Sequence, residues 1–116
     1  MLNEEIVKFI STKYNYVSCE GFETTCKAVE LLIEHPNDTI METYVRTAKY
    51  FGKKYGAIIK SIFDYKEKRP ETSKLKSKEF LYQIKYEYTY DSNRRKNNER
   101  NEKFADSGIY WNNKAD

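Results

Sequence analysis

The side chains of this 116-residue chain that could do chemistry are mostly basic, and six of them lie within residues 53–69. They are Lys53, Lys54, Lys60, Lys66, Lys68 and Arg69. Ammonium and guanidinium groups bind phosphate oxygens, so this set could hold a protein in register on the backbone of a nucleic acid. The alternative is that these side chains form the solvated face of an ordinary helix.

Base readout would need further groups on the same stretch, because a lysine on a phosphate carries no sequence information. The candidates are Lys60 and Tyr55, with Ala57 and Ile59 for apolar contacts to thymine methyl groups.

A second basic group lies in the polar run 91–103, which we predict to be a loop. It consists of Arg94, Arg95 and Lys96. On a wing it could contact the DNA backbone or the minor groove. Alternatively, it only makes the loop soluble.

Other kinds of chemistry have little support in the sequence. Cys19 and Cys26 are seven residues apart with no second pair, and the single histidine, His35, precedes a proline, so no zinc signature is present. No phosphate-binding loop and no carboxylate pair occurs at a telling spacing. We therefore expect no metal, no cofactor, no small-molecule substrate and no enzymatic activity.

The composition is typical of a soluble protein with a small core. Only 39% of the residues are hydrophobic and 34% are charged, and the chain contains eleven tyrosines. A net charge of +3 permits nucleic-acid binding without requiring it. No apolar run approaches the roughly 20 residues of a membrane span, and the acidic N-terminus is unlike a signal peptide. We expect a cytoplasmic protein that makes no membrane contact.

The stretch that must position the first basic group, residues 44–63, has the spacing of a helix-turn-helix. Ala48 is small enough for a second helix to cross the first at that place. Gly52 can adopt the positive φ that the turn needs. Ile58 directs the apolar edge of the second helix back onto the first. An ordinary helical hairpin is the alternative.

Helical spacing of apolar residues predicts about four helices in the first part of the chain. They cover residues 3–13, 22–34, 39–51 and 57–68. Asn3 can cap the first helix, and Asp38 or Thr39 can cap the third. On the second helix, the charged side chains are expected to face water. These are Glu23, Lys27, Glu30 and Glu34.

The aromatic segment 80–90 alternates aromatic and polar residues, which predicts a half-buried strand. A helix that uses Leu81, Ile84 and Tyr88 is the competing interpretation. Residues 104–111 could return as a second strand and complete a wing. The predicted fold is therefore mainly α, with a β-hairpin or wing as an option at the C-terminus.

The domain organisation predicted from these elements has three parts. Residues 1–70 form the helix-turn-helix domain, residues 71–79 a linker, and residues 80–116 an aromatic-rich extension that could pack on the same domain as a wing.

Residues 21–65 resemble the C-terminal DNA-binding domain of the stage-zero sporulation regulator family of endospore-forming bacteria. The residues that carry the resemblance are Gly21-Phe22, Lys27-Ala28-Val29, Tyr44, Ala48, Lys49, Phe51, Gly52, Ile58 and Ile62. The resemblance implies a helix-turn-helix fold and DNA binding. The chain departs from the family at the outward positions of the second helix, where the family carries Ser, Arg and Glu. Those positions here hold Gly56, Ala57, Ile59 and Lys60.

Together these observations predict a sequence-specific double-stranded DNA-binding protein of helix-turn-helix type. It would act as a transcriptional regulator or as a plasmid or phage accessory protein in DNA maintenance or transfer, and a homodimer would match paired half-sites. The alternative is a small protein-interaction module or inhibitor that keeps the fold without base readout. Ile59, Phe63 and the tyrosine stripe would then form the contact surface.

Overall fold

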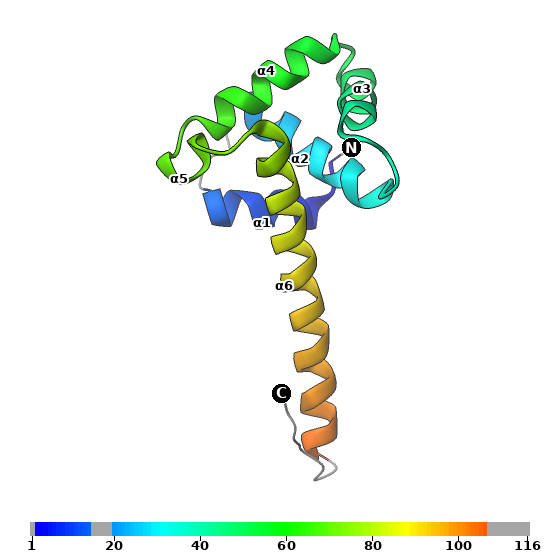
Figure 1. Ribbon diagram of the computed structural model, residues 1–116. Helices are drawn as coiled ribbons and strands as arrows, with labels where there is room; N and C mark the ends of the chain where they lie inside the picture. Colours follow the sequence, from blue (N-terminus) through cyan, green and yellow to red (C-terminus); the bar gives the residue numbers. More distant parts are fainter. Residues whose placement is uncertain (1, 15–19, 107–116) are drawn as a thin grey trace. The chain divides into compact units, whose positions relative to one another are not determined.

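The chain folds as helices, which confirms the mainly α class (Figure 1). The computed structural model describes residues 2–14 and 20–106, with side chains through residue 92. The helices are α1 Glu4–Tyr14, α2 Glu20–Glu34, α3 Ile40–Phe51, α4 Tyr55–Lys66, α5 Pro70–Ser73 and α6 Ser77–Asp106. Of the described residues, those up to Tyr86 form one compact unit, and residues 87–106 belong to a second.

Helix α2 is the centre of the first unit, because α1, α3 and α4 all pack against it. Phe22, Val29 and Leu32 on this helix are fully enclosed. The partners also cover Lys27 and Glu30, which we had predicted to face water. Only Glu23 and Glu34 of that predicted charged face are exposed.

Lys27 and Glu30 are tolerated in the interior because they satisfy one another. Lys27 Nζ donates to Glu30 Oε2 at 3.0 Å, and the Asn3 backbone N–H donates to Glu30 Oε1 at 2.9 Å. Burial alone would raise the pKa of Glu30, but these two hydrogen bonds and the Lys27 charge outweigh it and lower that pKa. The Lys27 ammonium also lies 4.2 Å from the ring centre of Tyr50, so it links α2 to α3.

A glycine sets the distance between α2 and α4. A Cβ atom on Gly21 would lie 2.6 Å from the Ser61 carbonyl oxygen and 2.8 Å from Tyr65 Cβ. Any other residue would force the two helices apart. Beside this contact, the rings of Phe22 and Tyr65 meet edge to face with their centres 6.0 Å apart. The glycine therefore permits the close packing that fixes α4 on the core.

The start of α1 is capped as predicted. Asn3 Oδ1 accepts hydrogen bonds from the backbone N–H groups of Glu5 at 2.9 Å and Ile6 at 3.2 Å.

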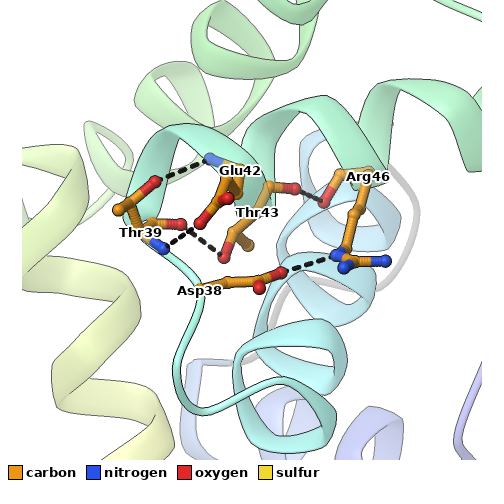
Figure 2. Close-up of polar contacts among 6 residues, drawn as sticks. Asp38, Thr39, Glu42, Thr43 and Arg46 are labelled. Atoms are coloured by element: carbon orange, nitrogen blue, oxygen red, sulfur yellow. Dashed lines mark hydrogen bonds and ion pairs between the residues drawn. The ribbon is translucent and has the colours of Figure 1, made fainter.

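The start of α3 is a capping box, which Figure 2 shows. Thr39 Oγ1 accepts from the Glu42 backbone N–H at 3.2 Å, and the Thr39 N–H donates to Glu42 Oε1 at 2.7 Å. Of the two predicted caps, Thr39 is therefore the one used. Asp38 instead accepts a hydrogen bond from Arg46 Nε at 2.5 Å.

The turn between α3 and α4 has the conformation that the glycine spacing predicted. Gly52 has φ +66° and ψ +37°, and the Lys53 N–H returns to the Ala48 carbonyl at 2.9 Å. Ala48 is buried at the end of α3, and Ile58 and Ile62 of α4 are completely enclosed. Helix α4 begins two residues before the predicted start and ends two residues before the predicted end.

The prediction of a strand over residues 80–90 is wrong, because this segment lies within α6. Phe80, Leu81 and Ile84 are buried on one helical face, whereas the side chain of Tyr86 is 72% exposed. The Phe80 ring lies 5.7 Å from that of Tyr14 and 6.0 Å from that of Tyr65, centre to centre. Tyrosine can place its ring on a core or its hydroxyl in water, so alternating tyrosines do not identify a buried face.

Helices also cover parts of two other C-terminal segments, those predicted as a linker and as a returning strand. Helix α5, Pro70–Ser73, extends into the range 71–79 that was predicted as a linker, and α6 begins within that range at Ser77. Residues 104–106, the start of the predicted returning strand, belong to α6, and its remaining residues, 107–111, lie outside the described part of the chain. The described residues thus contain no strand that could build a wing.

Candidate nucleic-acid interface

The outward side of α4 is the surface on which the predicted DNA-binding residues meet. Ile58, Ile62 and Tyr65 hold this helix on the core by their buried side chains. Gly56, Ala57, Lys60 and Asp64 are exposed, and Ile59 is half-buried at the edge. The open surface thus begins with two very small residues, and an added Cβ at Gly56 would meet nothing within 4 Å.

The N-terminal end of α4 carries two exposed lysines. Lys54 occupies the N-cap position in an extended conformation, and no side chain caps the helix. The Ala57 N–H already donates to the Lys54 carbonyl at 3.0 Å. The first two amide donors of the helix, those of Tyr55 and Gly56, and the positive end of the helix dipole are therefore left for water or for an external anion. Lys53 is 40% exposed and forms an ion pair with Glu20 of α2. Tyr55 is exposed beside them.

Lys60 lies in the middle of the outward surface. Its side chain is 76% exposed, and its Nζ is 3.3 Å from Asp64 Oδ2 one turn later. An exposed pair of this kind contributes little to stability. The Lys60 ammonium group can therefore leave Asp64 and bind an acceptor on another molecule.

The structure places Lys66 in the interior, away from the predicted interface. Its residue is only 2% exposed. Its Nζ donates to Glu67 Oε2 at 2.7 Å and to the Ser73 carbonyl at 3.1 Å, and it lies 4.5 Å from the ring centre of Phe63. Lys66 thereby ties α5 to the end of α4 and does not reach a phosphate. The sequence does not indicate this burial, because Lys66 stands beside other basic residues, Lys68 and Arg69, that remain at least partly exposed.

The remaining predicted basic residues are distributed over two other places. Lys68 is exposed just after α4. Arg69 is partly exposed, with its guanidinium 5.4 Å from the ring centre of Tyr14 and a hydrogen bond of 3.4 Å to Glu71. The second basic group, Arg94, Arg95 and Lys96, lies in α6 instead of a loop, and its side chains lie outside the described residues.

Comparisons with known protein families, with curated proteins and with solved structures found no match for this chain.

The described residues provide neither a reactive thiol nor a cluster of metal ligands. The Cys26 thiol is fully buried, and burial, with the nearby charges of Glu23 and Glu30, raises its pKa to about 12, so it stays neutral and unreactive. Cys19 lies outside the described residues. In the described ranges, no group of three or more His, Cys, Asp or Glu side chains could hold a metal ion. None of the helices in those ranges is long and apolar enough to cross a membrane.

Two further features of the exposed surface bear on the sequence predictions. Two large apolar side chains of α4, Tyr55 and Phe63, are 51% and 48% exposed. In addition, the segment treated as a linker presents Lys74, Lys76 and Lys78 to solvent. The exposure of Phe63 agrees with the interaction-module alternative. The basic charge of residues 74–78 was overlooked, although a count of charges along the sequence would have shown it.

Proposed function

We propose that this chain is a double-stranded DNA-binding protein of helix-turn-helix type that inserts α4 into the major groove. The observation that carries the proposal is the combination of the Gly52 turn with an α4 that has one side fixed on the core and the other in solvent. An α-helix fits the major groove, whose width is about 12 Å. The absence of side-chain bulk at Gly56 and Ala57 would allow the backbone of α4 to approach base edges closely.

Phosphate binding is assigned to the N-terminal end of α4. Lys53 and Lys54 would place their ammonium groups beside the backbone, and the uncapped amides of the first turn would support them. Base readout is assigned to Lys60, which can donate to guanine O6 and N7. Ala57 and Ile59 are the candidates for contact with thymine methyl groups. The resemblance of residues 21–65 to a DNA-binding domain supports the same assignment.

The test is selection of bound sequences from a random duplex pool at physiological salt. We expect an enriched motif and a preference for it over random duplex of about 10³ or more at about 150 mM salt. Lys60→Ala should change the preferred base at one position, because that side chain is assigned to a base. Lys54→Ala should weaken binding to all sequences alike. The matched control is Lys8→Ala, which removes an exposed lysine of α1.

A second candidate function is a protein-interaction module, which the exposed rings of Tyr55 and Phe63 favour. Exposed aromatic side chains are enriched at protein interfaces and are not needed to bind phosphates. A preference below roughly tenfold between selected and random duplexes would move the assignment to this alternative. Phe63→Ser should then abolish partner binding, whereas it should leave duplex binding nearly intact if α4 reads DNA.

If the chain binds DNA, regulation of transcription and accessory roles in plasmid or phage maintenance or transfer are all consistent with a small protein of this design. A homodimer would place two copies of α4 on half-sites about 34–36 Å apart, one turn of the duplex. A palindromic motif in the selected pool would support that arrangement.

A further inference from the structure

The excess positive charge of the chain is concentrated away from the outward side of α4. Residues 66–78 contain six basic and two acidic side chains and carry a net charge of +4. The rest of the chain contains 15 basic and 16 acidic side chains and carries −1. The partly or fully exposed members of this segment are Lys68, Arg69, Lys74, Lys76 and Lys78, which we call the basic platform.

The backbone that carries the basic platform is held by specific hydrogen bonds. The Thr72 hydroxyl is buried and donates to the Lys66 carbonyl at 2.7 Å, with a longer contact of 3.3 Å to the Arg69 carbonyl. The buried Lys66 ammonium donates to the Ser73 carbonyl from the other side. The platform is therefore an ordered surface, and its lysines need not be gathered from a flexible linker when an anion binds.

The acidic residues around the platform are already engaged. Glu67 accepts from Lys66, and Glu71 accepts from Arg69. Glu79 accepts from the Lys76 backbone N–H at 2.9 Å at the start of α6. Among the described residues, the ammonium groups of Lys76 and Lys78 form no ion pair. Their charges are thus directed at solvent.

The platform has the character of a phosphate-binding surface rather than of a protein interface. No large apolar side chain is exposed between residues 67 and 79, and Leu75 is half-buried. Lysines without apolar neighbours suit a DNA backbone, which needs charge and does not require a hydrophobic core.

The basic platform begins at one end of α4, and Lys53 and Lys54 lie at the other end. Its first part, up to α5, lies at the end of α4 that is opposite the turn with α3, and the chain then turns back to the start of α6 (Figure 1). A helix of 12 residues is about 18 Å long, whereas the groove is about 12 Å wide. Lysines at the two ends of α4 can therefore reach phosphates on the two sides of one groove.

We propose that the basic platform is a second phosphate-binding surface, which binds the DNA backbone across the groove from Lys53 and Lys54. This inference rests on the proposed DNA-binding function. It also explains how a protein whose α4 carries few free cations could bind DNA with useful affinity, since the platform would supply most of the phosphate contacts.

The experiment measures affinity for a random-sequence duplex of about two helical turns as a function of salt. Each lysine–phosphate contact contributes about −0.9 to the log–log slope. Lys76→Gln with Lys78→Gln should therefore reduce the slope by about 1.8. The loss of affinity between 50 and 200 mM salt should accordingly shrink by about twelvefold relative to the wild type. The matched control, Lys8→Gln with Lys85→Gln, removes the same charge elsewhere and should leave the slope unchanged. Thermal melting of both variants verifies that they are folded.

The outcomes separate this inference from the proposed function. The inference is overturned if Lys76→Gln with Lys78→Gln shows the same salt slope as the control variant while Lys54→Ala still reduces the slope. In that case the proposed DNA-binding function stands. If the wild type fails to bind duplex even at 50 mM salt, both are overturned. A slope reduced only in the platform variant supports the inference.

Discussion

The α3–α4 helix pair and the first turns of α6 both bury apolar side chains in the compact unit that ends at Tyr86. Their conformations are specified by different kinds of signal. In α3–α4, local signals agree with one another: a capping box at Thr39, a left-handed turn at Gly52 and a regular helical spacing. In α6, the local pattern alternates with period two and favours a strand. Burial of Phe80, Leu81 and Ile84 selects the helix instead. The comparison teaches that agreement between several local signals is more informative than one strong periodicity.

The largest expected effect tests the α6 side of this comparison. Phe80→Ala should destabilise the protein by about 3–4 kcal/mol, because a 1% exposed ring between Tyr14 and Tyr65 is lost. Tyr86→Ala should change stability by less than about 0.5 kcal/mol. Urea denaturation measures both. In a strand, positions 80 and 86 would lie on the same face. Equal losses of unfolding free energy for the two variants would therefore favour the strand over the helix.

A pair of helical glycines tests the placement of α4. Gly21→Ala should cost about 2 kcal/mol, because the new methyl group would collide with backbone and Cβ atoms of α4. Gly56→Ala should instead stabilise the protein by about 0.5 kcal/mol, since its site is open and alanine favours helix. Melting temperatures of the two variants should move in opposite directions. A shift in the same direction would mean that α2 and α4 do not meet at Gly21.

The turn of the α3–α4 helix pair is tested at Gly52. Gly52→Val should destabilise by about 1–2 kcal/mol, because a β-branched residue must adopt positive φ there. The Cβ atom itself would meet nothing, so the cost comes from the backbone alone. Gly52→Asn is the control and should cost clearly less, since asparagine tolerates the left-handed region. Equal losses for valine and asparagine would point to a steric clash instead.

Apart from the control variants, the smallest expected loss of stability concerns the capping box. Thr39→Ala should cost about 1 kcal/mol, because the Glu42 backbone N–H loses its acceptor. Thr39→Ser keeps the hydroxyl and should remain close to the wild type. Chemical denaturation of the two variants measures the difference. If alanine and serine behave alike, the start of α3 does not depend on the box.

Several parts of the fold could be predicted because their cause is local. The caps at Asn3 and Thr39 need only a side-chain oxygen within a few residues of the helix start. The turn at Gly52 needs only a residue without a Cβ at positive φ. The apolar spacing of α1, α3 and α4 reports a single buried face on each of these helices, whereas α2 is buried on most of its surface. The exposure of Lys53, Lys54 and Lys60, which carry the proposed interface, agrees with that same spacing.

Other properties were decided only by tertiary contacts. Lys66 looks like its basic neighbours in the sequence, yet it is enclosed because α5 folds back to offer it a carbonyl. Lys27 and Glu30 look like a solvent face, yet α1 and α3 cover them. Phe80 selects a helix for its segment because Tyr14 and Tyr65 enclose it. In each case the side chain itself is compatible with both water and the interior, by its long aliphatic stem or its ring. Its environment therefore depends on partners that are distant in sequence, and sequence spacing cannot supply them.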